Sequence, residues 1–126
     1  MPPIHVVLTR QDPALTDKVV ASIQKPFLDV ATVSSQEDTR NAIARTKAEL
    51  AIVDLEIVNF SELGQLCHEF PSTAFVCIHR LADDGMWSKS LAAGAVDCCF
   101  SGELPRILQA SERYVAYKAT HTSPAA

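Results

Sequence analysis

The most constraining feature of this sequence is a run at residues 50–56 in which four apolar residues lead directly into Asp54. A continuous apolar run that is rich in β-branched residues predicts a strand buried on both faces of a sheet. Asp54 is therefore expected at the carboxyl edge of that sheet, where ligands and reactive groups collect in open α/β folds. A short acid at this position also often only bends or caps the loop after its strand, and the run alone favours neither role.

Strand and helix patterns alternate on both sides of this run. Further strands are predicted at residues 4–8, 27–33, 73–78 and 95–100. Amphipathic helices are predicted between the strands and after the last one, where a single helix should continue from Leu104 past Val115. Right-handed crossovers turn five strands and five helices into a parallel sheet with helices on both faces. The fold class is therefore α/β, a three-layer α/β/α domain with a five-stranded parallel sheet in the doubly wound, flavodoxin-like order.

Helix boundaries are marked by residues of specific types. Asp12 before a proline and Asp83 before a second acid are expected to cap the starts of two helices. Ser34, with a glutamate three residues later, predicts a capping box. Gly94 is expected to end the fourth helix in the left-handed conformation, and Ser101 to cap the last helix.

Length and charge exclude several functional classes. The 126 residues fit one domain, predicted at residues 1–118 and followed by a small, polar tail at residues 119–126. The net charge is −4 and the basic residues are scattered, so no basic stripe is present to bind nucleic acid. No apolar run approaches the ~20 residues that cross a membrane, and the first residues lack the features of a secretory signal. We therefore expect a cytoplasmic protein with neither nucleic acid nor a membrane as partner.

The four cysteines carry no paired C-x-x-C spacing, and we expect them to be reduced and buried. The alternative is a metal site, because Cys77 and His79 should share one face of a strand, with Cys98 or Cys99 on the neighbouring strand. Cysteines and histidines in buried strands usually serve packing, so no metal site is predicted.

With these elements in place, the chain resembles the CheY-like receiver domain of bacterial two-component response regulators over about residues 4–117. The matching segments are residues 12–15 at the start of the first helix, residues 53–55 at the end of the third strand, and residues 91–97. In that family the aspartate matched by Asp54 accepts a phosphoryl group from a histidine kinase, so the resemblance makes Asp54 the candidate phospho-acceptor.

The other positions of the family's site depart from its pattern. Arg10 and Gln11 stand where receivers carry the acidic pair that holds Mg²⁺, His79 replaces a hydroxyl residue, Ser101 replaces a lysine, and Cys98 replaces the aromatic switch residue. A cation and an amide in place of two carboxylates should weaken Mg²⁺ binding severely, so no cofactor is expected. The pattern is similar to that of a pseudo-receiver, which keeps the fold and loses the phosphorylation machinery.

Two of these departures suggest hypotheses about the edge of the sheet. Arg10 and Asp54 should end adjacent strands, and an ion pair between them would hold the edge in one state. The alternative for Arg10 is a solvated loop charge. His79 is expected to form hydrogen bonds in its loop, with pH sensing as the alternative.

The leading functional interpretation is a signalling domain that is not an enzyme and acts by protein contact. The resemblance implies that this contact is made through the face formed by the fourth helix, fifth strand and fifth helix. The partner would be a histidine kinase, a separate output protein or a second copy of the chain. Candidates on this face are Trp87, Tyr114 and Tyr117, although burial is the default expectation for Trp87. One alternative is a working receiver that phosphorylates Asp54 with Mg²⁺, and a less favoured one is a small-ligand-binding module of the flavodoxin-like fold.

Overall fold

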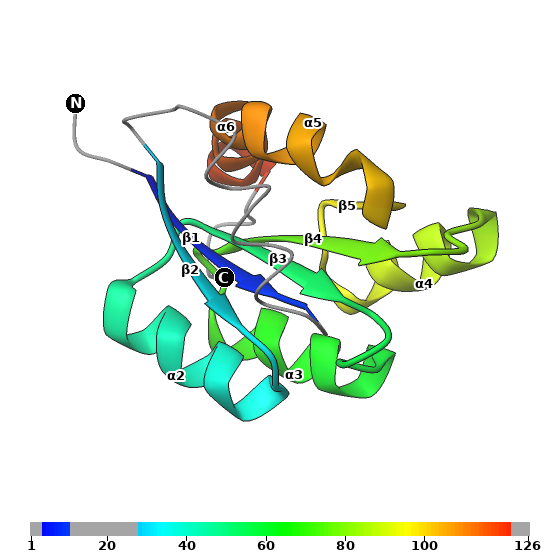
Figure 1. The fold of residues 1–126 in the computed structure, drawn as a ribbon, viewed down its shortest axis with the longest axis horizontal. Helices are drawn as coiled ribbons and strands as arrows, with labels where there is room; N and C mark the ends of the chain where they lie inside the picture. Colours follow the sequence, from blue (N-terminus) through cyan, green and yellow to red (C-terminus); the bar gives the residue numbers. More distant parts are fainter. Residues whose placement is uncertain (1–3, 11–27, 122–126) are drawn as a thin grey trace.

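The computed structural model describes residues 4–10 and 28–121. The strands within these ranges form one parallel sheet (Figure 1). The sheet has five strands in the order β2-β1-β3-β4-β5, which confirms the predicted topology. The strands are β1 Ile4–Thr9, β2 Leu28–Val33, β3 Leu50–Asp54, β4 Ala74–His79 and β5 Asp97–Phe100. The strands β2 and β5 are the two edges, and β3 lies at the centre.

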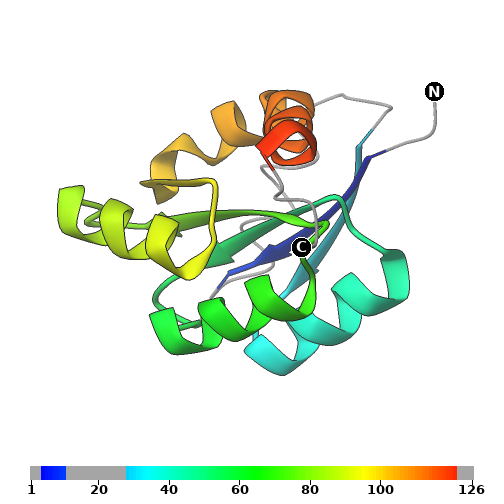
Figure 2. The ribbon, with the colours of Figure 1, turned by 180° about the vertical axis from the view of Figure 1, so that it is seen from behind.

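Helices cover both faces of this sheet (Figures 1 and 2). The helices are α2 Gln36–Thr46, α3 Phe60–Glu69, α4 Asp84–Ala93, the short 3-10 helix η1 Ser101–Glu103, α5 Leu104–Gln109 and α6 Ser111–His121. The helices α2 and α3 lie on one face and α5 and α6 on the other, while α4 packs beside α3 and β5. The helix predicted to begin at Asp12 lies outside the described residues. No helix in the described ranges is long and apolar enough to cross a membrane.

The central strand β3 is buried along its whole length, as its apolar run predicts. Ala51 and Val53 belong to the core cluster on the α2 and α3 face, together with Phe75. Leu50 and Ile52 belong to the cluster on the opposite face, which packs against α5. Because alternate side chains enter two separate cores, both faces of the strand are excluded from water and Asp54 is left at its carboxyl end.

The predicted N-cap of α2 is wrong by one residue. Ser35, not Ser34, caps α2, and its Oγ accepts a hydrogen bond from the Asp38 backbone N–H at 3.1 Å. The expected capping box is therefore absent from α2, because neighbouring serines offer equivalent hydroxyls and the sequence does not distinguish them. A full capping box instead begins α3, between Asn59 and Glu62.

The last helix is not continuous, contrary to the prediction. It breaks at Ala110 into α5 and α6, because the Ser111 hydroxyl donates to the Leu108 carbonyl at 2.7 Å and competes for an acceptor that a continuous helix would use. The predicted cap is also wrong, since Ser101 begins η1 and its buried Oγ has no hydrogen-bond partner among the described residues. The helix α6 reaches His121, so residues 119–121, predicted as tail, are helical.

Candidate functional site

Asp54 occupies the last position of β3, at the carboxyl edge of the sheet, as predicted. The residue is only 3% exposed. Asp54 Oδ1 accepts a hydrogen bond from the Glu56 backbone N–H at 2.9 Å, and its carbonyl accepts from the Ile57 and Val58 N–H groups at 3.0 Å. The buried acid is therefore hydrogen-bonded by the turn that follows its strand.

Burial has the largest effect on the pKa of this carboxyl group. Loss of water raises the Asp54 pKa above its ordinary value of 3.8, and the neighbouring Glu56 carboxylate acts in the same direction. The Glu56 backbone N–H, the Arg10 guanidinium and His79 lower this pKa, but they do not cancel the effect of burial. The net effect is a pKa above the ordinary value of an aspartate.

We expect the Asp54→Asn variant to be more stable than the wild type at neutral pH, and this difference should vanish near and below pH 3.8. A raised pKa in the folded state means that stability is retained below the unfolded pKa and lost as the pH rises through the folded pKa. The neutral amide avoids this loss. Urea unfolding of both proteins at neutral pH and at about pH 3.5 measures the effect. A variant that is less stable at neutral pH would contradict the electrostatic account.

The predicted ion pair between Arg10 and Asp54 is absent from the described part of the chain. The Arg10 backbone N–H donates to the Val33 carbonyl at 3.0 Å, which anchors Arg10 towards the edge strand β2. The strand β3 lies on the other side of β1, and Asp54 Oδ1 already accepts from its own turn. The half-buried Arg10 therefore acts on Asp54 only through space. Gln11, the second position of the family's acidic pair, lies outside the described residues.

His79 serves the turn after β4. Its Nδ1 accepts a hydrogen bond from the Leu81 backbone N–H at 2.9 Å, which confirms the prediction of a hydrogen-bonding loop residue. The adjacent Arg80 forms an ion pair with Glu56, with 2.7 Å between Arg80 Nη2 and Glu56 Oε1. This pair joins the two turns beside Asp54. Sequence reasoning missed it, because the partners are 24 positions apart and belong to different turns.

The described residues at this edge differ in their charge. Arg10 brings a positive charge, Glu56 is paired with Arg80, and the pKa of Asp54 is raised. No group of three or more His, Cys, Asp or Glu side chains in residues 4–10 and 28–121 could hold a metal ion. Cys77 and His79 therefore belong to no such group among these residues.

The cysteines are free thiols in the core or at its margin. Cys77 and Cys98 are partners in the register of β4 and β5. Burial raises the pKa of Cys77 to about 12 and that of Cys67 and Cys99 to about 11, so these thiols stay protonated at neutral pH. The half-buried Cys98, at the position of the family's aromatic switch, packs against the core on the α3 side.

A second candidate region lies where α4 meets the edge strand β5. Trp87 on α4 is 47% exposed, so the default expectation of burial is wrong, and Phe100 at the end of β5 is 50% exposed. The reason lies in the packing of α4, which fully buries only Ser90. Both aromatic rings line a groove of about 500 Å³. Its lining residues are Ala82, Asp83, Asp84, Trp87, Cys98, Cys99, Phe100 and Glu103.

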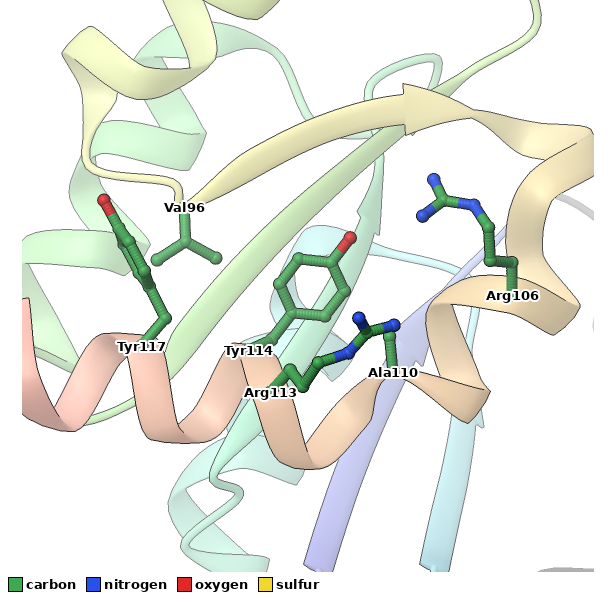
Figure 3. A pocket seen from close by; sticks show the side chains of 6 residues that line it. All are labelled: Val96, Arg106, Ala110, Arg113, Tyr114 and Tyr117. Carbon is green, nitrogen blue, oxygen red and sulfur yellow. The ribbon is translucent and has the colours of Figure 1, made fainter.

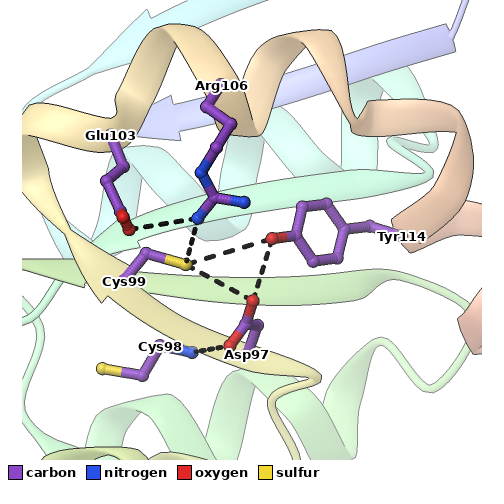
Figure 4. A network of polar contacts seen from close by, with 6 residues as sticks. All are labelled: Asp97, Cys98, Cys99, Glu103, Arg106 and Tyr114. Carbon is purple, nitrogen blue, oxygen red and sulfur yellow. Dashed lines mark hydrogen bonds and ion pairs between the residues drawn. The ribbon is translucent and has the colours of Figure 1, made fainter.

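Tyr114 belongs to a polar network that ties α6 to β5 (Figure 4). The Tyr114 hydroxyl donates to Asp97 Oδ2 at 2.9 Å, and the Cys99 thiol donates to the same oxygen at 3.4 Å. Burial and the bond to Asp97 raise the Tyr114 pKa, which keeps the hydroxyl protonated. Arg106 Nη2 donates to Glu103 at 3.1 Å and approaches the Cys99 sulfur at 3.8 Å. The network gives Tyr114 a structural role that sequence spacing did not indicate.

Tyr117, the third predicted interaction residue, is 49% exposed and lines a cavity of about 290 Å³ beside this network (Figure 3). Arg106 and Arg113 contribute positive charge to the cavity, and Tyr114 lies beside Arg113 in the view. The carboxylates of Asp97 and Glu103 lie in the connected network and offset these charges. The cavity therefore favours neither an anionic nor a cationic ligand.

No protein-family model and no curated protein matches this sequence. Solved structures do match the fold. A receiver domain (CheY-like) of a response regulator from Methanospirillum hungatei gives a TM-score of 0.79 at 16% identity, over 94% of this chain and 98% of that chain. A response regulator from Thermotoga maritima gives 0.78 at 20% identity, over 92% and 99%. A LuxR-family two-component response regulator from Aurantimonas gives 0.77 at 13% identity, over 91% and 86%. The chain therefore has the fold of the response-regulator receiver domains.

Proposed function

We propose that this chain is a receiver-like signalling domain that acts by protein contact and does not depend on phosphorylation of Asp54. The observation that carries the proposal is the enclosure of Asp54, which is 3% exposed and has a raised pKa. An acceptor carboxylate must be ionised and open to the phosphoryl donor. The raised pKa of Asp54 acts against ionisation, and its burial acts against access. The domain is thus proposed as a binding module, not an enzyme.

The surroundings of Asp54 give further support to this proposal. Phosphoryl transfer depends on cations that neutralise the charge of the transferred group, and in receivers a bound metal ion and a lysine supply this positive charge. Here the position of that lysine is Ser101, whose hydroxyl is buried. Glu56 and Arg80 bind each other across the two turns. We propose that the pair keeps the domain in one conformation.

The face formed by α4, β5 and the α5 and α6 helices is the proposed contact surface. Trp87, Phe100 and Tyr117 are about half exposed on it, and exposed aromatic side chains are enriched where proteins bind one another. A histidine kinase or a separate output protein is the proposed partner, with a second copy of the chain as the alternative.

Incubation with acetyl phosphate and Mg²⁺, followed by intact-mass measurement, tests phosphorylation directly. We expect no phosphoryl adduct under conditions that label an ordinary receiver domain included as the positive control. The Asp54→Asn variant and a sample without Mg²⁺ are the matched negative controls. A gain of one phosphoryl group that requires both Asp54 and Mg²⁺ would overturn the proposal and establish the alternative of a working receiver, which the position of Asp54 on β3 favours.

A further inference from the structure

The groove between α4 and β5 combines apolar surface with negative charge. Leu81, Trp87 and Phe100 are three of the four large hydrophobic residues that are exposed in the described ranges. Trp87 and Phe100 line the groove itself, and Leu81, 71% exposed, adjoins its lining residue Ala82. Exposed apolar side chains that cluster at a concave site are typical of protein-binding surfaces.

The charges of the groove are unbalanced. Asp83, Asp84 and Glu103 line it, and the only cation in hydrogen-bonding distance of these carboxylates, within the part of the chain that the structure describes, is Arg106. Arg106 binds Glu103 at 3.1 Å, so Asp83 and Asp84 remain without a compensating ion pair among the described residues. Asp83 Oδ1 accepts from the Met86 backbone N–H, but this bond does not cancel its charge. The groove is therefore acidic as well as aromatic.

We infer that this groove binds a cationic segment of a partner protein, with arginine or lysine side chains beside an aliphatic or aromatic anchor. The inference rests on the proposed function and specifies the chemistry of its partner. Guanidinium and ammonium groups would pair with Asp83 and Asp84 and lie against the faces of Trp87 and Phe100, which attract cations. The apolar anchor would cover the exposed rings. An acidic segment would meet like charges and lose affinity.

The groove contains its own reporter, because Trp87 is the only tryptophan of the chain. The probe is a short peptide without tryptophan in which arginine alternates with leucine. Docking should remove water from Trp87 and shift its fluorescence, and affinity should fall as salt is raised. Two control peptides separate charge from anchor: one replaces every arginine by glutamate, and the other replaces every leucine by alanine. Both controls are expected to bind more weakly.

Matched variants assign the binding to the groove. Asp84→Asn should weaken the arginine–leucine peptide about two- to fivefold, the range for one exposed charge pair. Asp38→Asn is its control, since Asp38 is also an exposed acid in the first turn of a helix and lies on α2, outside the groove. Phe100→Ala should weaken binding through the loss of the apolar contact, without loss of folding by circular dichroism.

Several results would overturn the inference. These are an unchanged Trp87 signal with the arginine–leucine peptide, equal or tighter binding of the glutamate peptide, or equal effects of Asp84→Asn and Asp38→Asn. A Trp87 signal that changes only with protein concentration, together with dimer formation in sedimentation velocity, would identify a second copy as the occupant instead. Phosphorylation of Asp54 without loss of peptide binding would reject the proposed function alone, so the two failures are distinguishable.

Discussion

Replacement of Phe75 by alanine is expected to lower the free energy of unfolding by about 3–5 kcal/mol. Phe75 is fully buried in β4 and belongs to the core cluster between the sheet and the α2 and α3 helices. Its carbonyl also accepts a hydrogen bond from the Val96 N–H at 2.8 Å, just before β5 begins. Loss of the ring removes apolar contacts and leaves a cavity that the packed strands on either side cannot close.

Denaturant unfolding followed by circular dichroism measures this change, and Phe100→Ala is the matched control. Phe100 is the same residue type on the neighbouring strand, but its side chain is half exposed. We expect this control to cost less than about 1 kcal/mol of stability while it impairs the groove. Equal losses in the two variants would show that Phe75 does not contribute more to the core than Phe100 does.

Gly94→Ala is expected to destabilise the protein by about 2 kcal/mol or more, because two penalties act at one position. Gly94 ends α4 with a φ of 115°, a left-handed conformation that L-residues with side chains rarely adopt. An added Cβ would also lie 2.8 Å from Cys67 Cβ on α3. Relief of this contact requires α4 to move away from α3, so we expect the groove beside α4 to be altered as well. Thermal unfolding and Trp87 fluorescence measure the two effects.

Gly64→Ala is the matched control for Gly94→Ala. Gly64 lies inside α3, and an added Cβ there would meet no atom within 4 Å. We expect a gain in stability of about 0.5–1 kcal/mol, since alanine loses less backbone entropy than glycine in a helix. If Gly64→Ala destabilised the protein as much as Gly94→Ala, the conformation and contact at Gly94 would not be the cause.

The sequence by itself determined the sheet, the position of Asp54 and the end of α4. The apolar run before Asp54 is typical of an inner strand, and Gly94 is the residue type that a left-handed helix end favours. Asp83 caps α4 as predicted, because a cap depends on residues a few positions apart. These features follow from local chemistry and periodicity, which a single sequence carries in full.

Only the tertiary structure decided which side chains meet. It separates Arg10 from Asp54, pairs Arg80 with Glu56, and bonds Tyr114 to Asp97. Each outcome depends on the path of a turn or on the packing of a helix against a strand far away in the sequence. A favourable contact between two residue types is available to many pairs in a chain, and the geometry of the folded backbone selects the few that form. For the same reason the exposure of Trp87, and with it the acidic and aromatic groove, depends on how α4 packs beside β5.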